Sequence, residues 1–289
     1  MDMNILNMNY DIKTDLLGFL YNMTTGIEMS RIIAVQNSAV RLLFNIINNP
    51  KEIDKNTLLM SACILKELCT NAVNPTIHSK LMSEDIMKIL LQLSKTEIIE
   101  LKSDVSSCVF DLTKSSHDNT VKVIEENGIE VLYYLTLNDN LDFHEDLRLY
   151  TSLALCNMTA NSQLQCVMVA NSVHIMPIMK SIILSNNEET LTHIATTVFN
   201  LMIFESSKVL MLKKNVIGIV FDLAATGAYL ITQLIVFLLH TALYLQSKNT
   251  THTQKHKCVQ TLRHLRISIM YFVIIKIDVR FCIQKLRCK

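Results

Sequence analysis

The histidines and the cysteine around residue 255 have the residue types and spacing that come nearest to a metal site. His252, His256 and Cys258 form a His-x-x-x-His-x-Cys pattern, and imidazole and thiolate groups are the usual protein ligands of zinc. The same stretch contains Lys255 and Lys257, which are typical of a solvated basic loop. We therefore interpret the stretch as a loop and predict neither a metal nor a cofactor.

Other kinds of active site are not indicated by the sequence. The chain of 289 residues contains 5 glycines and 3 prolines, where average usage predicts roughly 20 and 14. Glycine-rich phosphate loops and dinucleotide-binding turns are therefore excluded. The remaining histidines lie at unrelated positions and form no set for nucleophilic catalysis. We predict that the protein is not an enzyme.

The cysteines indicate a cellular compartment. The eight cysteines lie mostly inside apolar stretches, without the paired spacing of a zinc site, which is typical of buried free thiols in a reducing environment. The first residues, Met1 to Asn7, lack the basic and apolar regions of a signal peptide. We expect a cytoplasmic protein, and a nuclear, cytoskeletal or ciliary association stays open.

A short pattern with a polar residue between apolar ones recurs through the first 200 residues. Successive polar residues, here called the anchors, are 45, 44, 46 and 43 residues apart. A period of this length with helical spacing inside it indicates stacked helical units, because one such unit cannot bury its apolar face alone. The anchors are Asn22, Glu67, Asp111, Asn157 and Asn200. The expected core residues near them are Leu65, Leu68, Val109, Phe110, Leu112, Leu155, Met158, Val198, Phe199 and Leu201.

The period and the pattern resemble the armadillo repeat. Residues 152–161, Ser-Leu-Ala-Leu-Cys-Asn-Met-Thr-Ala-Asn, are similar to the third helix of the repeat. Residues 123–132, which contain Gly-Ile-Glu-Val-Leu, are similar to the start of another of its helices. The resemblance covers about residues 10–227, with a weaker sixth copy at 241–246. It implies an all-α, right-handed superhelix over residues 1–250, with about five full repeats and a degenerate sixth.

The resemblance also implies where a partner binds. In armadillo proteins the third helix of each repeat lines a concave groove, and the anchor side chain points into that groove. Carried over to this chain, the groove residues are the five anchors together with Asn71 and Asn161. An asparagine amide offers a donor and an acceptor to the backbone of an extended peptide, and the two acidic anchors favour a basic or polar partner. The alternative is that these polar groups only cap or solvate a helix face.

One feature differs from the nuclear-transport members of the family. Importin-α-like proteins have a tryptophan four residues before the anchor asparagine, and this chain contains no tryptophan. We therefore do not expect importin-type cargo binding. The equivalent positions here are Gly18, Cys63, Ser107, Leu153 and Thr196.

Charge divides the chain into an acidic body and a basic tail. Residues 1–250 contain 18 lysines and arginines against 25 aspartates and glutamates, whereas residues 251–289 contain 9 against 1. From Ile275 to Gln284 apolar and polar residues alternate, a period typical of a strand. The tail is a basic arm that binds an acidic surface, a segment that closes the last repeat, or sequence outside the evolved domain.

The predicted function is a non-catalytic scaffold or adaptor that holds a protein or extended peptide along the groove, with no nucleic acid bound. A transport-type peptide carrier is one alternative. A membrane-anchored tether is another, because residues 226–245 carry no formal charge and are long enough to span a bilayer. Gln233, His240 and the continued repeat phase favour a buried terminal repeat for this segment.

Overall fold

The computed structural model describes residues 10–48, 54–70, 75–137 and 145–226, and within these ranges the chain is helical, without strands. The helices fall into five groups, each with one long helix followed by two short ones. The long helices are α1 (Tyr10–Thr24), α4 (Lys55–Cys69), α7 (Ile99–Lys114), α10 (Glu145–Ala160) and α13 (Glu188–Ile203). The second helices are α2 (Glu28–Gln36), α5 (Pro75–Ser83), α8 (His117–Glu125), α11 (Gln163–Asn171) and α14 (Glu205–Lys213). The third helices are α3 (Ala39–Ile47), α6 (Ile86–Ser94), α9 (Gly128–Thr136), α12 (Ile175–Ile182) and α15 (Val216–Ala225).

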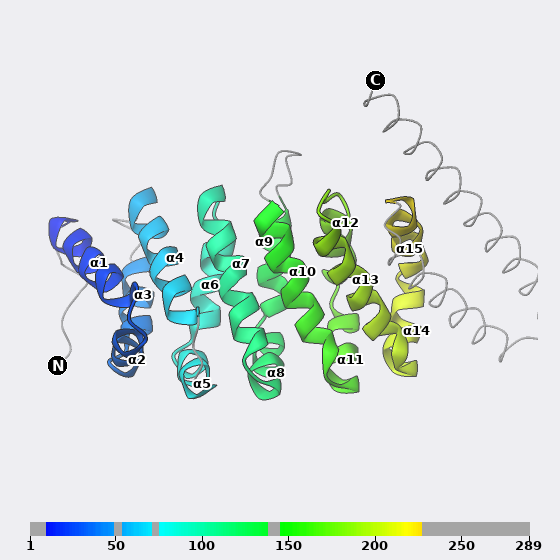
Figure 1. The fold of residues 1–289 in the computed structure, drawn as a ribbon, viewed down its shortest axis with the longest axis horizontal. Coiled ribbons are helices and arrows are strands. Elements are labelled where there is room, and N and C mark those ends of the chain that lie inside the picture. The colour runs from blue at the N-terminus through cyan, green and yellow to red at the C-terminus, as the bar shows by residue number, and fades with distance from the viewer. Residues whose placement is uncertain (1–9, 49–53, 71–74, 138–144, 227–289) are drawn as a thin grey trace, which may run out of the picture.

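Helices of the same type pack in rows across the groups. The five long helices lie side by side from α1 to α13, and the second and third helices form two further rows (Figure 1). Each group packs mainly on the groups before and after it. This arrangement is an α-solenoid, and the predicted all-α, armadillo-like fold class is confirmed.

Polar residues set the boundaries of the helices. Asp54, Ser116, Ser162 and Asn187 each precede a helix, and their side-chain oxygens accept a hydrogen bond from the backbone N–H three residues later. These N-caps satisfy donors that have no partner inside the helix. They fix where four of the helices begin.

A second set of residues makes the sharp turn between the two short helices of a group. In four of the five groups this turn contains one residue with positive φ, between 61° and 69°. Short polar side chains tolerate that backbone better than branched or bulky ones. The residues at these turns are Ser38, Asp85, Asn127 and Asn215.

The core runs along the whole array as one continuous cluster. Eight of the ten expected core residues are buried, and Phe110 and Phe199 are the exceptions. Both are only partly buried and pack against the edge of the core. Successive residues of a helix point about 100° apart, and the Phe110 ring lies 5.9 Å from the ring of Tyr150 on the next long helix, α10, outside the buried cluster. The prediction that these two residues belong to the core is wrong.

Several predictions concern residues outside the described ranges. These are the His252–His256–Cys258 pattern, the weaker sixth copy, the basic tail 251–289, Asn71, and all of residues 226–245 except Thr226. Among the described residues, no single helix is long and apolar enough to cross a membrane. The pair α13 and α14, bent by 116°, passes that test of length and composition only when both helices are taken together.

Candidate functional site

The predicted anchors lie in register on the row of long helices. Asn22 is exposed on α1, while Glu67, Asp111, Asn157 and Asn200 are half-buried on α4, α7, α10 and α13. We call the side of the long helices that carries the anchors the long-helix face. Of the two additional predicted residues, Asn161 is exposed directly after α10.

Hydrogen bonds connect the anchors to the preceding group. The Asn157 amide donates Nδ2–H to Thr113 Oγ1 on α7, at 3.3 Å. The Asn200 amide makes the same bond to Thr159 Oγ1 on α10, also at 3.3 Å. In both cases the threonine stands two residues after the preceding anchor. Asn157 and Asn200 are therefore partly accessible to solvent and also hydrogen-bonded to the preceding long helix.

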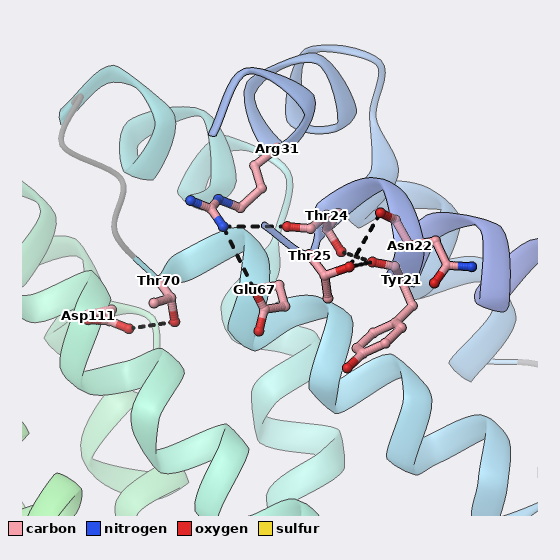
Figure 2. A network of polar contacts seen from close by, with 8 residues as sticks. All are labelled: Tyr21, Asn22, Thr24, Thr25, Arg31, Glu67, Thr70 and Asp111. Carbon is pink, nitrogen blue, oxygen red and sulfur yellow. Dashed lines mark hydrogen bonds and ion pairs between the residues drawn. The ribbon is translucent and has the colours of Figure 1, made fainter. Parts of the chain in front are cut away.

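The acidic anchors use related contacts near the N-terminal end (Figure 2). Thr70 Oγ1 donates to Asp111 Oδ2 at 3.3 Å. Arg31 of α2 lies between two groups, with Nη1 3.4 Å from the Thr24 carbonyl oxygen and 3.8 Å from Glu67 Oε2. The same nitrogen of the guanidinium thus pairs with the Glu67 carboxylate and donates to the carbonyl oxygen at the end of α1.

Arg31 belongs to a second repeated feature that the sequence reasoning missed. In four groups a side chain of the second helix donates to the carbonyl oxygen two residues after the anchor, near the end of the long helix. Such carbonyl oxygens lack partners inside the helix, so these bonds hold the second helix against the long one. The donors are Arg31, His78 Nε2, Thr120 Oγ1 and Cys166 Sγ, on the carbonyl oxygens of Thr24, Cys69, Thr113 and Thr159.

His78 shows the electrostatic consequence of this position. The ring is buried, and burial lowers its pKa, although the hydrogen bond to the Cys69 carbonyl opposes the shift. A carbonyl only accepts, so Nε2 carries the proton, and Nδ1 is buried without a hydrogen-bond partner among the described residues. The imidazole is therefore a neutral structural donor at pH 7.

A polar cluster connects α4 and α7 in the middle of the long-helix face. Asp104 accepts from Lys66 Nζ at 2.8 Å and from Cys63 Sγ at 3.3 Å. Burial, followed by the hydrogen bond to Asp104, raises the pKa of Cys63 to about 11. The position that corresponds to the importin-type tryptophan is thus occupied in this group by a protonated thiol bound to a carboxylate.

Two aromatic rings, one on α7 and one on α10, lie on the same row of long helices as this cluster. The rings of Phe110 on α7 and Tyr150 on α10 lie 5.9 Å apart between centroids. Lys114 Nζ stands 5.5 Å from the centre of the Phe110 ring, within the range of a cation–π contact. The site therefore offers aromatic surface beside the carboxylate of Asp111, one residue from Phe110.

The sequence contains a signal for these residues. Asp104, Tyr150 and His193 all stand seven residues before an anchor, and Glu100, Asp146 and Glu189 stand eleven before one. Seven and eleven residues are close to two and three helical turns, so both sets lie on the anchor side of their helices. A search for a second polar position at these offsets would have found them.

Half of the basic residues of the long helices are buried, whereas none of the acidic residues that the structure describes there is in the buried set. They contain ten aspartates and glutamates and six lysines and arginines. Three of the six basic residues, Lys13, Lys102 and Arg148, are buried. Lys102 Nζ, for example, donates to the Tyr134 carbonyl oxygen at 3.2 Å, so its charge points away from the long-helix face. The outward-facing charge is therefore mainly negative.

Asp111 has an unusual protonation equilibrium. Burial raises its pKa from 3.8 to about 6, while the Thr70 hydrogen bond and the nearby Lys114 and Lys66 oppose the shift. A raised pKa in the folded state means that ionisation weakens the fold as pH rises through that value. At pH 7 the solenoid therefore holds a carboxylate that would be more favourable as a neutral group.

We expect Asp111→Asn to stabilise the protein at neutral pH. The amide keeps an oxygen for Thr70 and removes the ionisation, so the melting temperature should rise by about 3 °C at pH 7.5. The gain should shrink as pH falls through 6 and vanish near pH 4, where wild-type Asp111 is protonated. Scanning calorimetry of both proteins across pH 4 to 8 measures this, and a pH-independent difference would contradict the assignment.

The described cysteines are free thiols. Burial raises the pKa of Cys108, Cys156 and Cys166, the last to about 11. A thiol with a raised pKa is a poor nucleophile, because the thiolate is the reactive form. These thiols are therefore protonated at neutral pH.

Two further features of the described residues concern metal binding and cavities. No group of three or more histidines, cysteines, aspartates and glutamates there is placed to hold a metal ion. A hollow of about 430 Å³ lies between α3, α5 and the turn that follows α5, and its lining includes Arg41, Lys80 and Glu84. Glu84 pairs with Lys80 at 3.0 Å and accepts from Ser38 at 3.3 Å, so the charges lining this hollow largely satisfy one another.

Comparison with known proteins supports the fold. No family model matches the chain, and no curated protein sequence matches it. Among solved structures, a designed armadillo repeat protein in complex with the peptide (KR)4 is similar, with a TM-score of 0.63 and 12% sequence identity. The similarity covers 82% of this chain and 96% of the designed protein. The chain therefore has the fold of an armadillo repeat solenoid.

Proposed function

We propose that the protein is a non-catalytic scaffold that binds an extended, basic segment of a partner protein along the long-helix face. The observation that carries the proposal is the row of anchors in register on successive long helices. Each asparagine amide has two N–H groups and one carbonyl oxygen, and one N–H of Asn157 and of Asn200 is bonded to a threonine. The remaining donor and acceptor match the alternating groups of an extended backbone.

The charge and the aromatic surface specify the partner further. The acidic residues eleven positions before the anchors, Glu100, Asp146 and Glu189, attract lysine and arginine side chains. The Phe110–Tyr150 pair provides ring faces for their cationic heads or apolar stems. The similar designed solenoid was solved with an alternating lysine–arginine peptide, which is the same chemistry. A cytoplasmic location and the absence of catalysis are parts of this proposal.

Peptide titration tests the proposal. Fluorescently labelled (KR)4 and (DE)4 peptides should be titrated into the full chain at several salt concentrations. We expect (KR)4 to bind, with an affinity that falls as salt rises, and (DE)4 to bind at least ten-fold more weakly. Stronger binding of (DE)4 would assign the interaction to the basic tail 251–289, and equal or no binding of both would overturn the proposal.

Two asparagine variants locate the binding surface. Asn157→Leu and Asn200→Leu together remove the proposed backbone contacts and should weaken (KR)4 binding by at least ten-fold. The two lost threonine bonds lie at half-buried positions, so the melting temperature should fall only by a few degrees. Asn161→Leu, at an exposed position after α10, shows whether this residue belongs to the same surface.

A further inference from the structure

Neighbouring long helices are joined by the same pair of positions at two boundaries of the row. In each case the residue directly before one anchor contacts the residue seven positions before the next anchor. Between α4 and α7 this pair is Lys66 and Asp104, with Nζ and Oδ1 2.8 Å apart. Between α7 and α10 it is Phe110 and Tyr150, with ring centroids 5.9 Å apart. An ion pair therefore closes the first boundary, and two aromatic rings close the second, which we call the aromatic boundary.

The aromatic boundary is distinct among the long helices that the structure describes. By the same offsets, the pair between α1 and α4 is Tyr21 and Met60, and the pair between α10 and α13 is Cys156 and His193. Two phenyl-type rings thus meet only between α7 and α10 within these five helices. Both rings are half-buried, so each keeps part of its surface open on the long-helix face.

Lysines of the chain itself already stand beside these rings. Lys114 Nζ lies 5.5 Å from the centre of the Phe110 ring, and Lys66 interacts electrostatically with Tyr150. A lysine or arginine of a partner would therefore compete with Lys114 for the Phe110 ring and meet two like charges.

The carboxylates at this boundary are engaged by the same lysines. Asp104 pairs with Lys66, and Asp111 interacts with Lys114. The rings therefore lie where positive and negative charges are balanced, with little attraction for a further cation. An uncharged ring from a partner meets no repulsion there and can pack edge-to-face or offset-stacked against the existing pair.

Carboxylates with no ion pair among the described residues lie on both sides of the aromatic boundary. Asp146 is exposed on α10, four residues and about one helical turn before Tyr150. Asp15 is exposed on α1, seven residues before its anchor. These positions attract the basic residues of a partner, and the rings between them do not.

We propose that the aromatic boundary is a specificity site for one aromatic residue within the basic segment of the partner. This inference rests on the proposed function and narrows it from an unbroken run of lysines and arginines to a run interrupted by one ring. The Tyr150 hydroxyl makes no hydrogen bond within the described part of the chain, so it is free to bond to the partner backbone beside that ring.

Titration of three labelled peptides into the full chain tests this proposal. They are (KR)4 and two versions of it in which the fifth residue is tryptophan or serine, so that the last two carry equal charge. We expect the tryptophan peptide to bind about five-fold more tightly than the serine peptide, because a third ring joins the pair. The chain contains no tryptophan, so tryptophan emission reports the peptide alone and should shift to shorter wavelength on binding.

Matched variants assign the preference to the two rings. Phe110→Ala with Tyr150→Ala should abolish the preference for tryptophan and its emission shift, while the serine peptide keeps nearly its wild-type affinity. Tyr150→Ser alone changes a residue outside the core cluster and should lose most of the preference, in case the double variant does not fold. Phe199→Ala, at the same position before the anchor of α13, should keep it, and circular dichroism checks the fold of each variant.

The outcomes separate this inference from the proposed function. Equal binding of the tryptophan and serine peptides, a preference that survives loss of the rings, or an equal loss in Phe199→Ala would overturn the specificity site. The proposed function would still stand in those cases, because (KR)4 binds. If none of the three peptides binds, the proposed function fails, and the specificity site fails with it.

Discussion

Removing the two acidic anchors should weaken the binding of a basic extended peptide by at least ten-fold at low salt. Glu67→Gln with Asp111→Asn preserves side-chain shape and hydrogen-bond acceptors while it removes two negative charges from the long-helix face. Asp111 adjoins the Phe110–Tyr150 pair, and Glu67 stands on the neighbouring helix beside Arg31. Arg31 would then lose its carboxylate partner and add repulsion toward the peptide.

The control for this experiment changes the same net charge elsewhere. Asp118→Asn with Glu125→Gln alters two exposed residues of α8, a short helix outside the row of long helices. Titration of (KR)4 should give nearly wild-type affinity for this control. If both double variants lose affinity equally, long-range charge and not the long-helix face governs binding.

Adding a single methyl group at Gly128 should destabilise the fold by about 2 kcal/mol. Gly128 begins α9, and a Cβ there would lie 2.6 Å from the backbone oxygen of Val123 on α8 and 2.6 Å from its Cγ1. Val123 is fully buried, so relief requires α8 and α9 to separate. For a chain of this size the melting temperature of Gly128→Ala should fall by roughly 4–8 °C.

The same change to alanine at Gly18 should raise the stability of the protein. Gly18 lies inside α1, and a Cβ there would meet no atom within 4 Å. Gly18→Ala should therefore stabilise the helix by about 0.5–1 kcal/mol, because alanine loses less backbone entropy than glycine. Thermal unfolding of the two variants in parallel measures both effects, and a loss of stability at Gly18 would contradict the packing described for α1.

The fold followed from the sequence because its determinants repeat. The anchors at Asn22 to Asn200 keep one period, and apolar residues at helical spacing predicted the helices around them. The exposure of Phe110 and Phe199 could not be predicted from hydrophobicity alone, since an aromatic residue beside an anchor fits either the core edge or the surface. Tertiary position decides between these two environments.

The candidate site was predictable only in part for a similar reason. The anchors were identified by residue type and period, but their bonds to Thr113 and Thr159 join residues more than 40 positions apart. The position of Arg31 is filled by arginine, histidine, threonine and cysteine in successive groups. The hydrogen bond to the long helix is the same in each group, but the residue type that makes it differs. A search by residue identity therefore does not detect it.

The bonds between anchors and threonines give the array a fixed spacing. The side chains of Asn157 and Asn200 are each held by a threonine of the preceding group before any ligand arrives, so less conformational entropy is lost when a ligand binds them. We therefore expect the distance between contact points along a ligand, in addition to its charge, to affect how tightly it binds.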